Sequence, residues 1–374
     1  MKHRLKILFV ASLESMHAER WIKYFIHIGH EVHVISVDNN NINKEIEGSR
    51  VYNIRWNKKI NIINEIIRFF SIRKKFKKII NKINPDLCHV HGISIYGYIL
   101  KLVTNIPVVA TAWGSEVLID TKKSIKYRTI VSQTLKRVDL ITCDAQHIKD
   151  RMVTLGANKS KISIIYFGTE LDKFNPNKHN REYLISKGAM ADCKLIISLR
   201  SLKNIYDVQT LIKSIPIVMD NYPKIQILIV GDGPEKNKLI ELSKELQIED
   251  KILFCGRLSD DDLQTYTATS DIYVSTSTSD AGLASSTSEA MACGVPVIIS
   301  DNCDNRNWIV EEKTGLLFET GNHEMLAEKI NLLLTNSKLS ASIADAGKAL
   351  IENNNNWIVE MEKVNNIYNS LLNQ

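Results

Sequence analysis

Short apolar runs alternate with amphipathic stretches along almost the whole chain. The first run extends from Leu5 to Ala11, a helical pattern follows over residues 16–28, and the run HEVHVIS comes next. This order predicts a strand–helix–strand unit. Further strands are predicted at residues 86–92, 107–114, 139–144 and 161–168. Because strands joined by helices form parallel sheets with right-handed connections, residues 1–170 are predicted to form one doubly wound α/β domain.

The same alternation starts again after a polar stretch. Residues 171–193 contain Asn175-Pro176-Asn177 and predict a linker. Further strands are predicted at residues 194–200, 225–233, 251–257, 271–277, 296–300 and 314–318. We therefore expect a second doubly wound, Rossmann-like domain over residues 194–355, facing the first across a cleft at the carboxyl ends of the strands. Residues 356–374 predict a helix, roughly from Trp357 to Leu372, that can pack on either domain, so a crossing back to the first domain stays open.

Length and composition agree with this division. The chain has 374 residues, which exceeds the size at which one core usually stops growing. No apolar run reaches the ~18 residues that span a bilayer, and residues 1–4 lead into the first strand without a signal pattern. We therefore expect a cytoplasmic protein, with peripheral attachment to the inner face of the cell membrane as an alternative. The six cysteines are scattered without a CxxC pair, which predicts reduced thiols rather than disulfides or zinc ligands.

The charge is distributed unevenly along the chain. The net charge is +6, but the first 180 residues hold 30 Lys and Arg against 15 Asp and Glu, whereas the remainder holds 18 against 27. Many of the cations lie in residues 61–84, which predict a basic amphipathic helix. Such a helix can lie on an anionic membrane surface. It can equally pack on the sheet with a solvated outer face, and the sequence leaves both readings open.

The run from Ser275 to Ser300, STSTSDAGLASSTSEAMACGVPVIIS, contains the most informative local pattern. A loop of small residues leads to a helix that Glu289 is expected to open, and Gly294 ends that helix before a buried strand. A small-residue loop at a helix N-terminus suits a ligand that carries phosphates or hydroxyls.

Several motifs occur together in a fixed order. They are GHEVHVIS (29–36), PDLCHVHG (85–92), TAWGSE (111–116), LRSLKN (199–204), VGDGP (230–234), FCGRLSDDDL (254–263), SEAMACGVPVI (288–298), DNRNWI (304–309) and TGLLF (314–318). Through them the chain resembles the retaining glycosyltransferases of family four over nearly its full length. The resemblance implies an α/β protein with the two-domain GT-B fold that takes a nucleotide sugar as donor.

The resemblance assigns donor roles to residues of the second half. Glu289 matches the acid that holds the ribose hydroxyls, and Arg200 matches the arginine that reaches the diphosphate, for which a guanidinium is well suited. The remaining donor-binding candidates lie in turns and at the helix start: Gly231, Gly233, Gly256, Arg257, Gly282, Leu283, Ala284 and Ser285. The segment at Gly256 and Arg257 resembles the one whose backbone pairs with the nucleobase, which makes uridine the commoner expectation.

Two positions depart from the family pattern in this half. The family has a first acid eight residues before Glu289, where this chain has Ala281, so we expect Asp280 to take over the contact with the transferred sugar. Backbone amides at 282–286 are the alternative. The family lysine five residues after Arg200 is replaced by Ile205, which leaves Lys203 as the nearest basic substitute. Asp260 to Asp262 are expected to cap a helix rather than to form a metal-binding DxD motif, so we expect no metal or other cofactor.

The first half departs further from the family. It lacks the glycine-rich turn after the first strand, and Trp113 occupies the place of the family histidine. The polar and aromatic residues at these strand ends become candidates: His91 and Glu116 for catalysis, His17 and Trp113 for the acceptor. His91, His17 and Glu116 can equally be structural residues at strand and helix ends.

The expected reaction is glycosyl transfer with retention, from a UDP-sugar to a hydroxyl of a glycan or of a polyprenyl- or lipid-linked acceptor in bacterial surface polysaccharide synthesis. A same-face substitution is implied, in which cations stabilise the departing diphosphate. The alternatives are a catalytically impaired nucleotide-sugar-binding scaffold subunit and a sugar epimerase of the same fold. A phosphorylase would need a pyridoxal-binding lysine, and no such motif is evident. No RNA- or DNA-binding motif accompanies the cations, so we expect no nucleic-acid partner.

Overall fold

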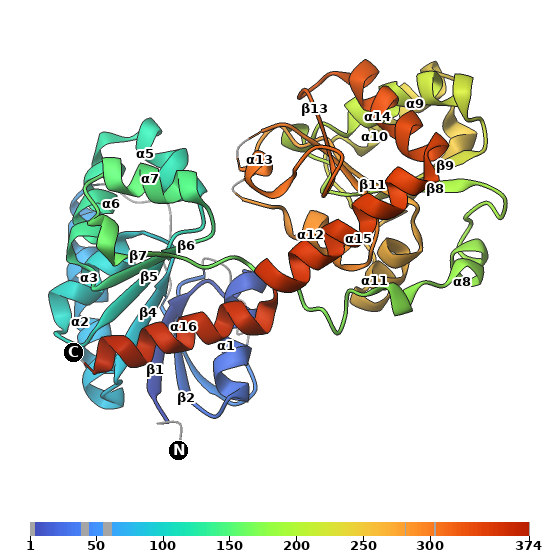
Figure 1. Cartoon of the computed structure of the whole chain (residues 1–374). Coiled ribbons are helices and arrows are strands. Elements are labelled where there is room, and N and C mark those ends of the chain that lie inside the picture. Colours follow the sequence, from blue (N-terminus) through green and yellow to red (C-terminus); the bar gives the residue numbers. More distant parts are fainter. Residues whose placement is uncertain (1–3, 39–44, 55–61, 281, 303, 374) are drawn as a thin grey trace. The chain divides into compact units, whose positions relative to one another are not determined.

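The computed structural model describes residues 4–38, 45–54, 62–280, 282–302 and 304–373 (Figure 1). The chain divides into two compact units. Unit 1 comprises residues 1–167 together with 360–374, and unit 2 comprises residues 168–359. Each unit is built around one parallel sheet with helices along its faces. Because strands covered on both faces must be apolar along their whole length, the near-continuous apolar runs of the sequence become these sheets.

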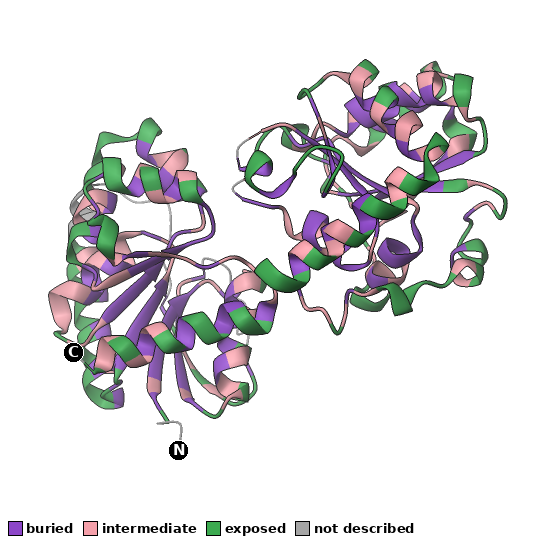
Figure 2. Ribbon diagram, viewed as in Figure 1, coloured by how far each residue is buried: buried purple, intermediate pink, exposed green. Residues whose placement is uncertain are grey.

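Unit 1 contains a seven-stranded parallel sheet in the order β3-β2-β1-β4-β5-β6-β7. The strands are β1 (Lys6–Ala11), β2 (Glu31–Ser36), β3 (Ser49–Asn53), β4 (Leu87–His91), β5 (Val108–Thr111), β6 (Leu140–Cys143) and β7 (Ile162–Ile164). In the central register Phe9 lies opposite Val34 on one side and His89 on the other. The strands predicted for this half are confirmed, and β3 is an addition. Figure 2 shows that the central strands are buried.

The helices of unit 1 follow the strands in order. They are α1 (Met16–His27), α2 (Ile62–Ile83), α3 (Ile95–Val103), α4 (Ser115–Leu118), α5 (Asp120–Lys123), α6 (Ile125–Arg137), α7 (Gln146–Thr154) and the 3-10 turn η1 (Lys159–Lys161). Helix α1 begins where the Ser15 side chain accepts a hydrogen bond from the Ala18 amide at 3.3 Å. It ends before Gly29, whose φ of 94° suits a residue without a Cβ.

The C-terminal helix α16 (Trp357–Leu372) has the predicted bounds, and from Glu360 onward it belongs to unit 1. The Tyr368 ring stacks on Phe25 of α1 with 4.9 Å between centroids, and its hydroxyl hydrogen-bonds His89 Nδ1 in β4. Asn365 Oδ1 lies 3.1 Å from His30 Nε2. Helices α1 and α16 therefore lie side by side over the same face of the sheet (Figure 1).

Unit 2 contains a six-stranded parallel sheet in the order β10-β9-β8-β11-β12-β13. The strands are β8 (Lys194–Leu199), β9 (Ile225–Val230), β10 (Ile252–Gly256), β11 (Ile272–Ser275), β12 (Val297–Ser300) and β13 (Leu316–Phe318). All six strands predicted for this half are confirmed. The order changes direction between β8 and β11, and in open parallel sheets such a point is where ligands bind, beyond the carboxyl ends of the strands.

Unit 2 has helices on both faces of its sheet. They are α9 (Val208–Asn221), α10 (Lys236–Glu245), α11 (Asp260–Thr269), α12 (Ser285–Ala292), α13 (Asn305–Trp308), α14 (His323–Thr335) and α15 (Ser337–Asn354), with 3-10 turns η3 (Asn204–Tyr206) and η4 (Glu249–Lys251). Asp260 to Asp262 form the first turn of α11, but the N-cap is Ser259, whose hydroxyl accepts a hydrogen bond from the Asp262 amide at 3.2 Å.

The segment predicted as an irregular linker is partly helical. It contains the 3-10 turn η2 (Pro176–Lys178) and helix α8 (Arg181–Ser186), and both belong to unit 2. Leu184 is buried, and the Arg181 guanidinium donates hydrogen bonds to the backbone carbonyls of residues 190, 191 and 193. The prediction of an irregular stretch is wrong for residues 181–186, because polar side chains on the outer face of α8 concealed its one buried position.

The cysteines carry no disulfide among the residues that the structure describes. Five of the six are free thiols: Cys88, Cys143, Cys193, Cys255 and Cys293. Burial raises the pKa of Cys88, Cys255 and Cys293 to about 12 each. The prediction of reduced thiols is confirmed for these five, and Cys303 lies outside the described residues.

Candidate active site

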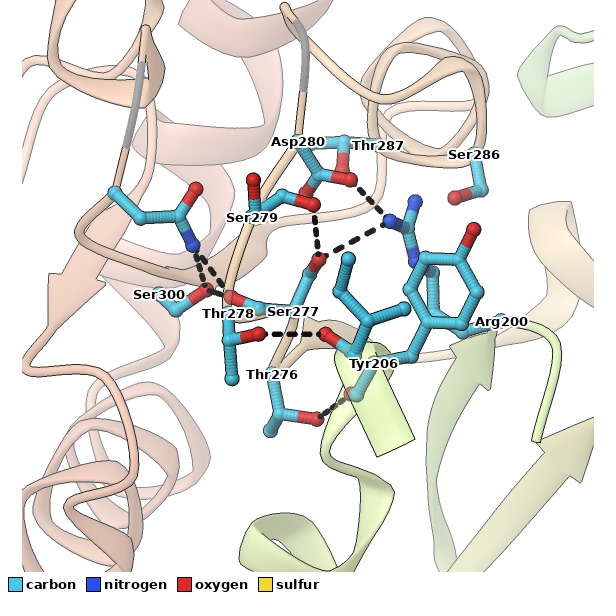
Figure 3. Close-up of polar contacts among 12 residues, drawn as sticks. Arg200, Tyr206, Thr276, Ser277, Thr278, Ser279, Asp280, Ser286, Thr287 and Ser300 are labelled. Carbon is cyan, nitrogen blue, oxygen red and sulfur yellow. Dashed lines mark hydrogen bonds and ion pairs between the residues drawn. The ribbon is translucent and has the colours of Figure 1, made fainter. Parts of the chain in front are cut away.

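Arg200 follows β8 directly and lies at the carboxyl end of the unit 2 sheet. One of its terminal nitrogens pairs with the Asp280 carboxylate, and the same nitrogen lies 3.4 Å from Ser277 Oγ (Figure 3). The side chains of Arg200 and Asp280 are 10% and 11% exposed. The Nε donor of Arg200 is buried and has no hydrogen-bond partner. A buried donor without a partner is costly, so this guanidinium can donate a further hydrogen bond to an anionic oxygen.

The electrostatics keep Arg200 charged. Burial, the largest single effect, lowers the pKa of this guanidinium, but the Asp280 carboxylate together with Tyr273 and Tyr206 leaves the pKa above its ordinary value. The Tyr206 ring adds to this environment, because Arg200 Cζ lies 4.4 Å from the ring centroid. A cation against an aromatic face is stabilised by the ring quadrupole. Tyr206 carried no signal in the sequence that marked it as a site residue.

Glycines bring neighbouring loops close to the backbone of Arg200. Gly231 has φ 131°, and a Cβ there would lie 2.3 Å from the Arg200 carbonyl oxygen. A Cβ on Gly233 would lie 2.3 Å from the Leu202 carbonyl oxygen. The Gly231 amide donates to the Gly256 carbonyl at 2.7 Å, and the Leu202 amide donates to the Asp232 carbonyl at 3.0 Å, so the chain segments at the ends of β8, β9 and β10 are joined. Arg257, the next residue along, is exposed.

The loop after β11 and helix α12 form the other side of Arg200. The Ser277 carbonyl accepts a hydrogen bond from Ser300 Oγ (Figure 3). It accepts another from Asn302 Nδ2. Further along the loop, Gly282 and Leu283 are buried and Ser285 is half-buried. Ala284 is the N-cap of α12 and supplies no side-chain cap. Ala281 lies outside the described residues.

Glu289 does not open this helix, as the sequence led us to expect. Helix α12 begins at Ser285, so Glu289 is its fifth residue, and its side chain is half-buried. The prediction of a carboxylate at the helix N-terminus is wrong, because the small polar residues 285–288 look like loop in the sequence but form the first turn. Glu289 therefore lies beyond the first turn, and stabilisation by the helix dipole no longer supports its assigned role.

Lys203 lies apart from the contacts of Arg200 that are described above. It is exposed and lines a small hollow with Asn204, Asp207 and Glu235. The chain turns back at Asp207, a non-glycine residue with φ 44°, where α9 begins. The structure thus brings together Arg200, Asp280 and the glycine turns among the predicted donor residues, and it places Lys203 at the outer side of the same turn.

The candidates of unit 1 gather at the carboxyl ends of β4 and β5. The His91 ring lies 5.2 Å from Trp113 and 5.3 Å from Trp21, centroid to centroid. The His17 ring lies 5.8 Å from Trp113 and 4.5 Å from Phe167. Trp113 and Phe167 stack with an interplanar angle of 2°. His17, His91 and Trp113 therefore belong to one aromatic cluster, and Phe167 and Trp21 are members that the sequence did not reveal.

Burial determines the protonation of the histidines in this cluster. Both ring nitrogens of His91 are buried without a hydrogen-bond partner, and burial together with His17 lowers the pKa of His91 to about 3. Burial, with a smaller contribution from His91, also places the pKa of His89 well below its ordinary value. The His89 ring is hydrogen-bonded to the Tyr368 hydroxyl through Nδ1 and to Thr111 Oγ1 through Nε2, the latter at 2.6 Å. Both rings are neutral near pH 7.

These lowered pKa values predict acid sensitivity of unit 1. Below about pH 6.5 these histidines are protonated in the unfolded chain, whereas the rings in the folded protein stay neutral. The free energy of unfolding therefore falls as the pH falls toward 3, by up to ~1.4 kcal/mol per pH unit for one ring. Replacing His91 by phenylalanine should flatten the pH dependence between pH 4 and 6.5 in urea unfolding. His89 remains, so part of the slope persists.

The exposed His179→Gln variant is the control for losing an imidazole elsewhere. If the stability curves of wild type and His91→Phe run parallel from pH 7 to 4, the His91 ring does not resist protonation in the folded protein.

Glu116 joins two loops of unit 1. Its Oε1 accepts hydrogen bonds from the Trp113 amide at 2.7 Å and from the Ile93 amide at 3.4 Å. Burial raises the pKa of Glu116, while these backbone bonds act in the opposite direction. Glu116 thus bonds the backbone of the segments that follow β4 and β5, and these bonds give it a structural role in positioning Trp113.

The basic helix α2 packs one face on unit 1 and exposes the other. Its buried residues are Ile72, Phe76, Ile80 and Ile83. Five of its exposed cations lie close together, Arg73, Lys74, Lys75, Lys77 and Lys78, and Lys82 follows near the end of the helix. The side chains of Ile67 and Phe70 are 62% and 58% exposed. In the described part of the chain no helix is long and apolar enough to cross a membrane, and the same residues contain no cluster of three or more His, Cys, Asp or Glu that could hold a metal ion.

Comparison with known proteins supports the family. Residues 181–350 match the family described as Glycosyl transferases group 1, and residues 6–145 match Glycosyl transferase 4-like. N-acetyl-alpha-D-glucosaminyl L-malate synthase of Bacillus anthracis is 24% identical over 286 residues, which cover 74% of this chain and 73% of that protein.

Two solved structures have the same fold. HepE of Anabaena in complex with UDP-glucose has a TM-score of 0.78 at 17% identity, covering 98% of this chain and 100% of that one. The lipopolysaccharide outer core galactosyltransferase WaaB has a TM-score of 0.75 at 16% identity, covering 98% and 99%. Each unit is an α/β unit with a parallel sheet, and each matches the family. The chain therefore belongs to the group 1 glycosyltransferases of family four and has the GT-B fold.

Proposed function

We propose that this glycosyltransferase is a retaining enzyme that moves a hexosyl or N-acetylhexosaminyl unit from a UDP-sugar to an acceptor hydroxyl. The observation that carries the donor assignment is Arg200, a buried cation at the carboxyl end of β8 with an unpartnered Nε. A guanidinium in a nearly dry site binds phosphate oxygens strongly, because water does not compete. The complex of HepE with UDP-glucose supports a uridine nucleotide.

The other donor contacts follow from the chain around Arg200. Glu289 accepts hydrogen bonds from the ribose hydroxyls, and the backbone at Gly256 and Arg257 pairs with the base. The amides from Gly282 to Ser285 face the sugar or the diphosphate, since α12 begins there without a side-chain cap. The close approach of Gly231 to Arg200 supports this arrangement, because it leaves no room for a side chain between the two loops.

The proposed chemistry is a same-face substitution at the anomeric carbon. The bond from that carbon to the diphosphate oxygen breaks, the acceptor oxygen bonds to the same face, and the departing diphosphate takes the acceptor proton. Arg200 stabilises the negative charge that grows on the diphosphate, with Lys203 as a weaker candidate. Under this scheme the protein needs no metal, because the guanidinium supplies the positive charge.

Asp280 is proposed to contact the transferred sugar once a diphosphate has replaced it at Arg200. Replacing Asp280 by alanine should lower turnover about 10–100-fold, because a hydrogen bond to a charged group is lost. Asp280→Asn should lose less, since the amide still makes hydrogen bonds. Steady-state kinetics of both variants test this, and near-normal turnover of both would contradict the role.

The acceptor is proposed to be a glycan or a polyprenyl- or lipid-linked saccharide of the bacterial surface, bound by unit 1 through His17 and Trp113. The similarity to WaaB, a lipopolysaccharide outer core galactosyltransferase, supports this class. The exposed cations of α2, next to the exposed Ile67 and Phe70, support peripheral binding to an anionic membrane, which gives access to such acceptors.

Liposome flotation tests the membrane proposal. Wild type should float with anionic vesicles at low salt and dissociate as salt rises, and neutralising the five α2 cations to glutamine should abolish flotation. The charge-matched control neutralises five exposed lysines of unit 2: Lys224, Lys238, Lys244, Lys313 and Lys338. Equal flotation of the two variants would contradict a role for α2.

A donor screen tests the enzymatic proposal as a whole. Thermal shift with UDP-, GDP- and other nucleotide sugars should single out one donor, and that donor should then release its nucleoside diphosphate when an acceptor is added. Binding without release would favour the scaffold alternative. Conversion of the free nucleotide sugar into its epimer would favour the epimerase.

A further inference from the structure

The Tyr206 ring packs against the guanidinium face of Arg200, with Arg200 Cζ 4.4 Å from the ring centroid (Figure 3). We propose that Tyr206 is a positioning residue for the donor diphosphate, which holds the Arg200 guanidinium in the orientation that presents its in-plane N–H groups to the phosphate oxygens. The inference rests on the proposed function, since it requires a diphosphate at Arg200.

The guanidinium packs on the ring through its face and donates hydrogen bonds through its edge. All N–H donors of arginine point outward in the plane of the group, so a ring against the face takes none of them. The terminal nitrogen on one edge binds Asp280 and Ser277, while Nε is buried and unpartnered. The ring therefore stabilises the cation without competing with an anion that approaches along the plane.

The backbone around Tyr206 is held in place by the opposite loop. The Tyr206 carbonyl accepts a hydrogen bond from Thr276 Oγ1 at 2.9 Å (Figure 3). The Ile205 carbonyl accepts one from the Thr278 amide at 2.8 Å and one from Thr278 Oγ1 at 3.0 Å. The turn that carries the ring is thus bonded to the loop that carries Asp280. Arg200 lies between two elements that are linked to each other.

The residue before Tyr206 in the chain is apolar. Ile205 is 42% exposed, so the turn adds no positive charge at that position. More of the diphosphate charge then has to be neutralised by the nearly dry Arg200, and the orientation of its guanidinium becomes decisive. An aromatic face is a means of fixing a cation that leaves its charge intact.

The test compares binding of a nucleoside diphosphate with binding of the same nucleoside by calorimetry, using UDP against uridine and GDP against guanosine. In Tyr206→Leu the affinity for the preferred diphosphate should fall about 5–30-fold, while the affinity for the nucleoside stays within about twofold. Tyr206→Phe keeps the ring and should bind both as wild type does. In an Arg200→Lys background, Tyr206→Leu should have a much smaller effect on diphosphate binding.

The matched control is Tyr183→Leu. Tyr183 also carries a cation on its ring, with Lys187 Nζ 5.2 Å from the centroid, but at another place in unit 2. This variant should leave the ratio of diphosphate to nucleoside affinity unchanged. Tyr206→Met, which keeps more bulk, replaces the leucine variant if the latter fails to fold.

The outcomes separate the inference from the function on which it rests. If the wild type binds neither diphosphate more tightly than its nucleoside, the proposed donor site is wrong and the inference fails with it. If the wild type prefers the diphosphate but Tyr206→Leu and Tyr206→Met keep that preference, Tyr206 has only a structural role and the inference alone is overturned.

Discussion

Replacing Arg200 by lysine should lower kcat/KM by about 10²–10³-fold, the loss that follows removal of one donor that stabilises charge in a transition state. The Arg200 guanidinium can pack its flat face on Tyr206 and still donate hydrogen bonds to a phosphate from its edge. Lysine keeps the positive charge but has no planar group that can do both. The loss should fall mainly on kcat, because the leaving diphosphate gains negative charge as its bond to the sugar breaks. Arg200→Ala should lose at least as much.

The control lies at the other end of the same strand. Lys194 begins β8 and pairs with Asp271 at 2.7 Å, so Lys194→Met also removes an ion pair of a β8 cation. It should leave turnover within about twofold. Arg200→Ala leaves the nearly buried Asp280 without its partner, so its thermal unfolding is compared with that of the double variant Arg200→Ala/Asp280→Ala, which removes both charges, to detect a folding defect. Near wild-type turnover of Arg200→Lys would exclude Arg200 as the cation that stabilises the diphosphate.

The sheets could be predicted from the sequence because their strands are buried on both faces. KLIISL, for example, is almost entirely apolar and becomes β8 in the middle of the unit 2 sheet. Strand β3 was missed because its five residues, SRVYN, contain three polar ones. It lies at the sheet edge, where a strand has one neighbour and its side chains meet solvent. Such a strand needs fewer apolar residues, so its sequence lacks the apolar run that marks a central strand.

The candidate site shows the same limit at the level of single residues. Arg200 and Gly231 could be found because each follows a predicted strand in a local motif. The pairing of Arg200 with Asp280 joins residues 80 positions apart, and the packing of Tyr206 depends on how a short turn folds back. The backbone contacts of Glu116 likewise arise only when the ends of β4 and β5 lie together. Local pattern cannot supply such contacts.

Replacing Gly231 by alanine should destabilise unit 2 by about 2–5 kcal/mol, the sum of overpacking and of a backbone conformation that L-residues avoid. The added Cβ would lie 2.3 Å from the Arg200 carbonyl oxygen and 3.0 Å from its carbon. Both atoms belong to backbone, so neither can turn away as a side chain would. The loop after β8 must shift, and it carries the Arg200 guanidinium with it. The midpoint temperature of thermal unfolding should therefore fall. The affinity for UDP, measured on the folded fraction, should fall as well.

Gly321→Ala is the matched control in the same unit, because Gly321 also has a positive φ, 81°, but nothing lies within 4 Å of the added Cβ. It should cost only the backbone strain, about 1–2 kcal/mol. The difference between the two variants isolates the contact with Arg200. If both lose the same stability and Gly231→Ala still binds UDP as wild type does, the close approach of the two loops does not position Arg200. If Gly231→Ala loses much more stability and much more UDP affinity than the control, the glycine is required because the diphosphate-binding loop passes against its backbone.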